Sequence, residues 1–239
     1  MPPFPLVVFD FDGTLIQEEV IDEIARIAGV EEQVAAITAK AMNGEMDFTE
    51  SFLARVQLLK GTPVAVFQQV RAHINITPGA FELCKALKAS GCKLAVLSGG
   101  FTPVVHFVAA QLGVDYAHSN HLAYTSNGDH FTGQVIGRVV DAQRKADLLL
   151  DICKLENMSP SQAVVIGDGA NDLLMMKQAG RAIAFDGKAA VRKHVPRQCN
   201  GNLLDVIYHL GYDPEELRSL IDFDETKVVH TEPAAEWIE

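Results

Sequence analysis

The chain has 239 residues, enough for one large domain or for a core domain with a second domain inserted, and its 48% hydrophobic content is sufficient for a packed interior. Its formal net charge of −11 argues against a nucleic-acid partner, because binding to a phosphate backbone requires clustered lysine and arginine. No apolar run reaches the length of a membrane span and the first residues do not resemble a signal peptide, so we expect a cytoplasmic protein without a membrane partner.

The first predicted element is a short apolar strand, Leu6 to Phe9, which is followed by two aspartates one residue apart, Asp10 and Asp12. Its β-branched, uninterrupted apolar character is typical of a central parallel strand, and a Gly-Thr pair at residues 13–14 breaks it. Ligands of parallel sheets bind beyond the carboxyl ends of the strands, so Asp10 is expected to face a crevice there. On these residues alone, an Asx-rich turn that closes an ordinary strand stays open as an alternative.

A helical tract follows at about residues 18–72, with breaks at Gly29, at Asn43-Gly44 and at Gly61-Thr62-Pro63. The tract separates the first strand from the alternating elements that come after it. We therefore expect it to form an inserted helical cap over the crevice, with borders at about residues 16–75.

Helices and strands then alternate along the chain. We expect a helix at 77–90, a strand at 93–97, a helix at 103–112, a hairpin within 115–137, a helix at 141–156, a strand at 163–166, a helix at 171–179 and a strand at 182–185. This pattern predicts an α/β fold, a doubly wound, Rossmann-like parallel sheet built from residues 1–15 and 76–222. The last residues, 223–239, are expected to be disordered or docked on the surface.

The two aspartates after the first strand are suited to phosphoryl transfer. A carboxylate is a weak nucleophile, but it can attack phosphorus once a metal ion has neutralised part of the phosphate charge, which gives Asp10 the role of nucleophile and predicts an aspartyl-phosphate intermediate. Expelling an alkoxide requires a proton. Crowding by phosphate and carboxylates raises the pKa of a carboxyl group, so Asp12 is the expected general acid and, later, the general base.

Two further strand ends carry candidate groups. Ser98-Gly99-Gly100 offers a hydroxyl and backbone amides that can cradle a phosphoryl group, although a structural turn has the same composition. Asp168 follows the strand at 163–166 and offers a hard oxygen ligand for Mg²⁺, together with Asp10. Nearby, Asp172 either supports these ligands or charges a helix start, and Asn171 either caps that helix or contacts the substrate.

Two basic residues have roles that depend on the fold. Lys145 lies in the first turns of the helix at 141–156, where the helix dipole disfavours a cation; it is either solvated or brought to the crevice to screen Asp10 and phosphate. Arg55 falls on an apolar helical stripe, where its guanidinium either binds an anion such as a carboxylate or extends to the rim. The apolar members of this stripe are Phe48, Phe52 and Leu59.

Cysteine and histidine do not form a strong metal-binding pattern. The four cysteines, Cys84, Cys92, Cys153 and Cys199, are scattered without a Cys-x-x-Cys pair, which is typical of reduced, buried thiols. His118 and His121 could supply two ligands of a metal site, but a second cluster of ligands is missing near them in the sequence.

These motifs, in this order, resemble those of the haloacid dehalogenase superfamily, over nearly the whole chain to about residue 210. An aspartate at the position of Asp12 is typical of its phosphatases and mutases. The resemblance implies that Asp10 is the nucleophile and that Asp12 is the acid/base and binds Mg²⁺ through its backbone carbonyl. It also implies that Ser98 and Lys145 hold phosphate, that Asp168 binds the metal and that Asp172 supports them.

Within the superfamily, the chain resembles the phosphoserine phosphatases. Further matching stretches are residues 19–22, 41–44, 48–56, 97–101, 132–133 and 141–143. By this resemblance, Glu19 binds the substrate ammonium, Arg55 binds its carboxylate, and Met42 with Phe48 shields the site from water. Gly99, Gly100 and Asn171 complete the expected substrate contacts. One departure is the segment from Ala184 to Ala189, which lacks the Ala-Lys-Pro run usual in that family and so bears on the identity of the substrate.

We therefore expect Mg²⁺-dependent hydrolysis of a small phosphomonoester, O-phospho-L-serine, as in the last step of serine biosynthesis. One alternative keeps the mechanism but changes the substrate or the acceptor, for example to phosphohomoserine or to transfer onto homoserine. Another alternative is a non-catalytic module that binds Mg²⁺ or phosphate on the same fold.

Overall fold

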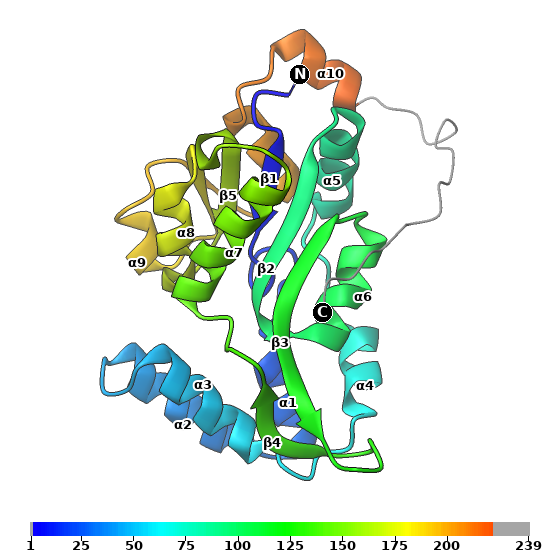
Figure 1. Cartoon of the computed structure of the whole chain (residues 1–239), viewed down its shortest axis with the longest axis vertical. Helices are drawn as coiled ribbons and strands as arrows, with labels where there is room; N and C mark the ends of the chain where they lie inside the picture. Colours follow the sequence, from blue (N-terminus) through cyan, green and yellow to red (C-terminus); the bar gives the residue numbers. More distant parts are fainter. Residues whose placement is uncertain (1, 222–239) are drawn as a thin grey trace.

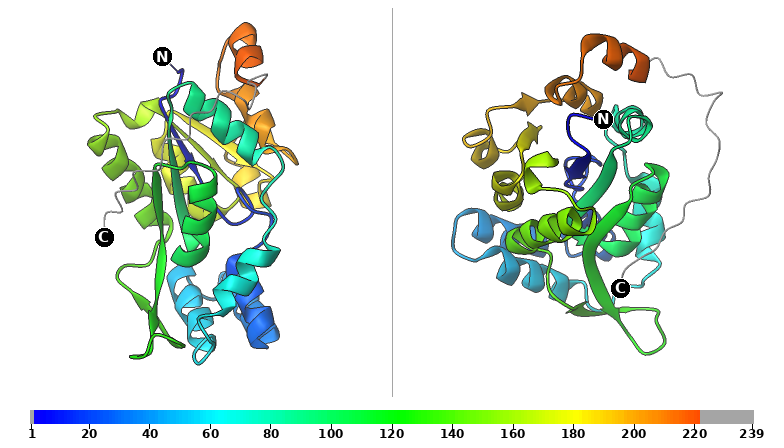
Figure 2. Two further views of the ribbon diagram at one scale, coloured as in Figure 1. Left: turned by 90° about the vertical axis from the view of Figure 1, so that its right-hand side faces the viewer. Right: turned by 45° about the horizontal axis from the view of Figure 1, so that its top comes forward.

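The computed structural model describes residues 2–221, and its centre is a seven-stranded sheet with helices on both faces (Figures 1 and 2). The strand order is β4-β3-β2-β1-β5-β6-β7, and neighbours are parallel except for the β3–β4 hairpin. The strands are β1 (Leu6–Phe9), β2 (Lys93–Phe101), β3 (Tyr116–Tyr124), β4 (Phe131–Ile136), β5 (Ala163–Gly167), β6 (Arg181–Phe185) and β7 (Gln198–Cys199). The predicted doubly wound α/β fold is confirmed.

Helices fill the connections between these strands. The chain from β1 to β2 forms α1 (Val20–Ala28), α2 (Glu31–Met42), α3 (Phe48–Leu58), α4 (Val66–His73) and α5 (Ala80–Ala89). The later helices are α6 (Thr102–Gln111), α7 (Ala142–Leu155), α8 (Leu173–Gln178), α9 (Ala189–Arg192) and α10 (Pro214–Ile221). The predicted breaks at 29, 43–44 and 61–63 separate α1 to α4. No helix within residues 2–221 is both long enough and apolar enough to cross a bilayer.

The central strand β1 is buried on both faces, as its uninterrupted apolar sequence predicts. Val7 and Phe9 pack in the core that includes residues of α5 and α6, whereas Leu6 and Val8 pack in the core that includes residues of α7 and α8. This alternation follows from the two-residue period of a strand. All four cysteines are free and buried, as expected.

The strand register brings the predicted motifs to one edge of the sheet. Phe9 in β1 lies beside Val96 in β2 and Ile166 in β5. Because the three strands are parallel, the residues just beyond these pairs lie side by side toward the carboxyl ends of the strands. Asp10 follows β1, Asp168 follows β5, and Ser98 lies two residues beyond Val96 within β2, so the three meet at this edge although they lie far apart in the sequence.

The prediction that the second strand ends at Leu97 was wrong, because β2 continues to Phe101. Its register against β3 shifts between Leu97 and Phe101, where pairing resumes with Asn120. Asn120 Nδ2 also donates to the Gly99 carbonyl at 2.9 Å. Ser98 to Gly100 is thus an irregular stretch of strand held by its neighbour, rather than a free turn.

Helices α1 to α4 lie together beyond the strand ends, at the bottom of Figure 1. The segments that lead into and out of them run side by side, since Gln17 N donates to Asn75 O at 3.0 Å and Thr77 N to Leu15 O at 2.9 Å. These contacts lie at the predicted cap borders, and the division into domains stays a prediction. The predicted tail at 223–239 lies outside the described residues.

The β3–β4 hairpin reaches the same end of the molecule (Figure 1). Gly61 N donates to Phe131 O at 2.9 Å, and Val64 N donates to Asp129 O at 2.8 Å. The hairpin is therefore bonded to the segment between α3 and α4, an association that the sequence did not predict.

Candidate active site

Asp10 lies at the centre of the site and is 3% exposed. Its backbone N–H donates to Ile166 O at 2.9 Å, which continues the β1–β5 pairing. Its Oδ1 accepts hydrogen bonds from Phe11 N at 2.7 Å and from Lys145 Nζ at 2.6 Å. Within residues 2–221, Oδ2 accepts no hydrogen bond, so it is the oxygen left for a metal ion or a substrate.

Lys145 is fully buried, and the fold brings it to the crevice rather than to solvent. Asp141 caps α7 by accepting a hydrogen bond from Arg144 N at 2.7 Å, and Lys145 lies one residue further on. Its Nζ also donates to Asp172 Oδ1 at 2.8 Å. Burial alone lowers the pKa of Lys145, but the carboxylates of Asp10 and Asp172 raise it above its ordinary value, so the ammonium stays charged.

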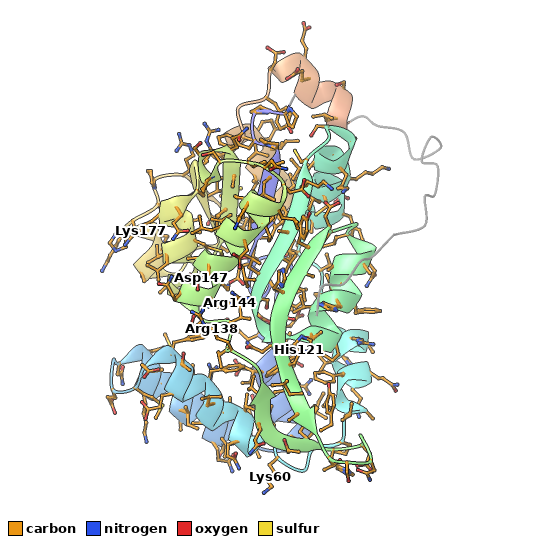
Figure 3. The ribbon with its side chains drawn as sticks, in the orientation of Figure 1. Lys60, His121, Arg138, Arg144, Asp147 and Lys177 are labelled. Carbon is orange, nitrogen blue, oxygen red and sulfur yellow. The ribbon has the colours of Figure 1, made fainter. Side chains whose placement is uncertain are left out.

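The exposed side of the same helix has a different kind of contact. Arg138 Nη1 pairs with Asp147 Oδ2 at 2.9 Å, and Arg144 lies nearby (Figure 3). The Arg138–Asp147 ion pair is partly exposed to solvent, so it contributes little to the free energy of unfolding. The buried lysine is the functional candidate on α7.

Asp10, Asp168 and Asp172 form a buried acidic cluster, in which one oxygen from each carboxylate lies within 4.8 Å of the others. Both oxygens of Asp172 are engaged, by Lys145 and by Gly169 N at 3.0 Å. Burial, and then the charge of Asp10, raise the pKa of Asp168 to about 6. Lys145 already pairs with Asp10 and Asp172, and the all-oxygen donor set of the cluster also suits a hard metal ion such as Mg²⁺.

Asp12 lies between the start of α1 and the end of β2. Its Oδ1 accepts a hydrogen bond from Val20 N at 2.9 Å, at the start of α1. On the other side, a Cβ added to Gly100 would be 2.8 Å from Asp12 Oδ2. Burial, followed by the charge of Glu19, raises the pKa of Asp12 well above its ordinary value, as a general acid requires.

Ser98 is buried, and its Oγ accepts a hydrogen bond from Gly100 N at 2.8 Å. Asn120, which is 2% exposed, holds this stretch: besides its bond to Gly99 O, its Oδ1 accepts from Val140 N at 2.9 Å. Asn120 was missed from the sequence because it lies within a strand and outside every motif. Only the pairing of β2 with β3 reveals its role.

Helix α3 carries Phe48 and Arg55 on one face. Phe48 Cζ is 3.6 Å from the position that a Cβ on Gly99 would take. Arg55 is half-buried; burial lowers its pKa, and the charges of Asp22, Glu19 and Asp12 partly oppose this. Met42, in contrast, is 81% exposed, so this structure does not bring its side chain onto the site.

Glu19 lies at the start of α1 and pairs with Lys188, a residue that the motif analysis missed. Lys188 Nζ donates to Glu19 Oε1 at 2.9 Å and lies 3.0 Å from Asp168 Oδ2. Its signal in the sequence is only that it follows the end of β6 by three residues, at the edge where the other motifs meet. Asn171 lies at the same edge, half-buried in the turn Ala170–Asp172. His118 and His121 are not members of the acidic cluster within the described residues.

Comparison with known proteins places this geometry among related enzymes. A model of the haloacid dehalogenase-like hydrolase family matches residues 4–180. A probable phosphoserine phosphatase of Schizosaccharomyces pombe is 44% identical over 218 residues, which cover 91% of this chain and 73% of that protein. The phosphoserine phosphatase of Saccharomyces cerevisiae is 44% identical over 214 residues, 89% of this chain and 69% of its own length.

Solved structures also resemble this chain. One described as a phospho-aspartyl intermediate analogue of phosphoserine phosphatase matches with a TM-score of 0.80 and 40% sequence identity. The match covers 86% of this chain and 98% of that structure.

Proposed function

The chain belongs to the haloacid dehalogenase-like hydrolase family, and from that premise we propose that it is a Mg²⁺-dependent phosphatase that hydrolyses O-phospho-L-serine to L-serine and phosphate. One observation carries the proposal. Asp10 Oδ1 is held by Lys145 inside a buried acidic cluster, which leaves Asp10 Oδ2 free to act as the nucleophile. The four buried, free cysteines fit a reducing compartment, so the proposal places the protein in the cytoplasm.

The reaction proceeds in two steps that use Asp10 and Asp12. Asp10 Oδ2 attacks phosphorus, the bond between phosphorus and the serine oxygen breaks, and Asp12 donates its proton to that oxygen. Water then attacks the phosphorus of phospho-Asp10 while Asp12 accepts a proton from it, and the bond from Asp10 to phosphorus breaks. The raised pKa of Asp12 supports its role as the proton donor in the first step.

Lys145 and Ser98 hold the reacting groups in place. Lys145 binds Asp10 Oδ1 and so orients Oδ2, while its charge reduces the repulsion between Asp10 and an incoming phosphate. Ser98 Oγ accepts from Gly100 N and donates its own hydrogen to a phosphoryl oxygen, and Gly99 and Gly100, which have no side chains, let the phosphoryl group approach the backbone. Because Asp10, Ser98 and Lys145 are buried and hydrogen-bonded to their neighbours, little reorganisation is needed when the charge moves.

The acidic cluster supports the choice of metal. Asp10 and Asp168, with the backbone carbonyl of Asp12, would hold Mg²⁺, which neutralises phosphate charge and makes phosphorus more electrophilic when bound. Asp172 supports this arrangement indirectly, since both of its oxygens are already bonded to Lys145 and Gly169.

Residues of the cap and of the site edge select the serine part of the substrate. Arg55 binds the carboxylate, Glu19 binds the ammonium, and Asn171 contacts the ester from the core. The position of Arg55 supports its role, because a half-buried guanidinium on an apolar face requires an anionic partner. The position of Phe48 beside Gly99 supports its role in shielding the site from water. The proposal does not extend this role to Met42, whose side chain is 81% exposed.

The proposal is tested by phosphate release across phosphorylated amino acids, including phosphohomoserine, and sugars and nucleotides, with and without Mg²⁺. We expect the highest kcat/KM on O-phospho-L-serine, and we expect Asp10→Asn to abolish turnover without changing the far-UV circular dichroism. Activity retained in Asp10→Asn would refute the mechanism.

Arg55→Ala tests the identity of the substrate. A selective loss of activity on phosphoserine, with activity on an aryl phosphate spared, supports the assignment, and an equal loss of activity on both contradicts it.

A further inference from the structure

Lys188 connects the acidic cluster of the core to the first helix of the cap. Asp186, which has a φ of 42°, turns the chain after β6, and Lys188 N then donates to Asp168 O at 2.7 Å. From this fixed backbone position, the side chain reaches both Asp168 Oδ2 at 3.0 Å and Glu19 Oε1 at 2.9 Å. One ammonium group thus bridges a metal ligand and the residue that receives the substrate ammonium.

The two ends of this bridge differ in their exposure to solvent. The side chain of Asp168 is 7% exposed, whereas those of Glu19 and Lys188 are 45% and 57% exposed. An ion pair that is half in water is weak, so another cation can break it. The side chain of Glu19 makes no capping bond with its own helix. Within residues 2–221, Glu19 forms its ion pair with Lys188.

We propose that Lys188 is an internal cation that competes with the substrate ammonium for Glu19 and thereby sets how strongly the site prefers amino-bearing phosphate esters. This inference rests on the proposed function. When O-phospho-L-serine binds, its ammonium displaces Lys188 from Glu19. When an ester without an amino group binds, Lys188 stays on Glu19 and supplies the positive charge that the substrate lacks.

The test compares O-phospho-L-serine with 3-phosphonooxypropanoate, which has the same phosphate and carboxylate but lacks the amino group. In Lys188→Met, we expect the KM for phosphoserine to fall about threefold to fivefold, because the competitor is gone. The KM for the deaminated ester rises by a similar factor, since Glu19 is left unpaired. Lys188→Arg keeps the cation and should preserve the wild-type preference between the two esters.

Lys193→Met is the matched control, since Lys193 lies in the same segment and is exposed. It removes one positive charge without touching Glu19 or Asp168, and its preference between the two esters should equal that of the wild type.

A second readout is independent of turnover. Calorimetry of the metal-free proteins should show that Lys188→Met binds Mg²⁺ about threefold more tightly, because Asp168 has lost a competing cation.

Equal changes in KM for both esters, or an unchanged ratio in an active Lys188→Met enzyme, would overturn the Lys188 proposal alone. Failure of the wild-type protein to hydrolyse phosphoserine would overturn the proposed function instead. In that case, calorimetry still decides the competition at Asp168, and unchanged Mg²⁺ affinity in Lys188→Met overturns it.

Discussion

At the scale of single residues, Gly99 and Gly100 are adjacent, but only Gly100 approaches Asp12, the proposed general acid. A Cβ on Gly100 would be 2.8 Å from Asp12 Oδ2 and 3.0 Å from Ser98 Oγ. A Cβ on Gly99 would meet Phe48 Cζ at 3.6 Å, an ordinary contact. Neither glycine has a positive φ, so alanine is compatible with the backbone at both positions.

We predict that Gly100→Ala lowers kcat by about tenfold to hundredfold, because displacing Asp12 removes part of the contribution of general acid catalysis. Gly99→Ala, the matched variant, should have a clearly smaller effect. Steady-state kinetics at saturating Mg²⁺ measures both, and thermal unfolding checks that both variants fold. Similar kcat values for the two variants would show that the position of Asp12 is not sensitive to this contact.

At the scale of elements, Asn120 on β3 joins two segments that carry proposed phosphate-binding groups, the end of β2 with Ser98 and the segment that leads into α7 with Lys145. Its side chain, on β3, bonds to the end of β2 through Gly99 O and to the segment before α7 through Val140 N. Strand pairing alone does not fix this region, because the β2–β3 register shifts here. The positions of Ser98 and of the start of α7 therefore depend on one buried amide.

We predict that Asn120→Ala lowers the free energy of unfolding by about 1–3 kcal/mol, because it leaves the partly buried carbonyl of Gly99 and the buried N–H of Val140 without these partners. The KM for phosphate esters should rise as well, since Gly99 is no longer held. The control is Asn127→Ala at the exposed hairpin turn, with an expected change within about 0.5 kcal/mol. Urea denaturation distinguishes them, and equal losses would argue against a special role of Asn120.

Comparison of the predicted and observed elements shows where sequence reasoning works. Motifs that directly follow apolar strands, such as those at Asp10 and Asp168, are placed correctly because parallel strands end at a common edge. Lys188 and Asn120 were missed because their roles depend on which strands are neighbours and on the register between them. The extension of β2 was missed for the same reason, since two glycines give no strand signal of their own.

At the scale of the whole molecule, the main electrostatic problem is an acidic protein that binds an anionic substrate. The formal net charge is −11, and three buried carboxylates meet at the site. Lys145 and Lys188 supply two positive charges near these carboxylates, and the proposed Mg²⁺ supplies further positive charge for the substrate phosphate. Stability should therefore depend jointly on pH and on the metal.

We predict that the gain in melting temperature on adding Mg²⁺ to metal-free protein shrinks as pH falls from 8 to 5. In the metal-free protein, the pKa of Asp168 is raised from its ordinary value of 3.8 to about 6. The folded state then holds this proton more tightly than the unfolded chain, so protonation below about pH 6 stabilises the metal-free protein. The same proton competes with the metal. Differential scanning calorimetry measures the melting temperature at each pH. A gain that stays constant from pH 8 to pH 5 would contradict the prediction.

The paired linkers at residues 15–17 and 75–77 bear on how this protein can be altered. Because the chain enters α1 and leaves α4 at nearly the same point, α2 and α3 can be lengthened or exchanged without moving Asp10 and Asp168, which follow β1 and β5. Helix α1 cannot be removed in the same way, because Val20 N holds Asp12 Oδ1. The residues of α3 that are proposed to choose the substrate can therefore change separately from the carboxylates that follow the strands.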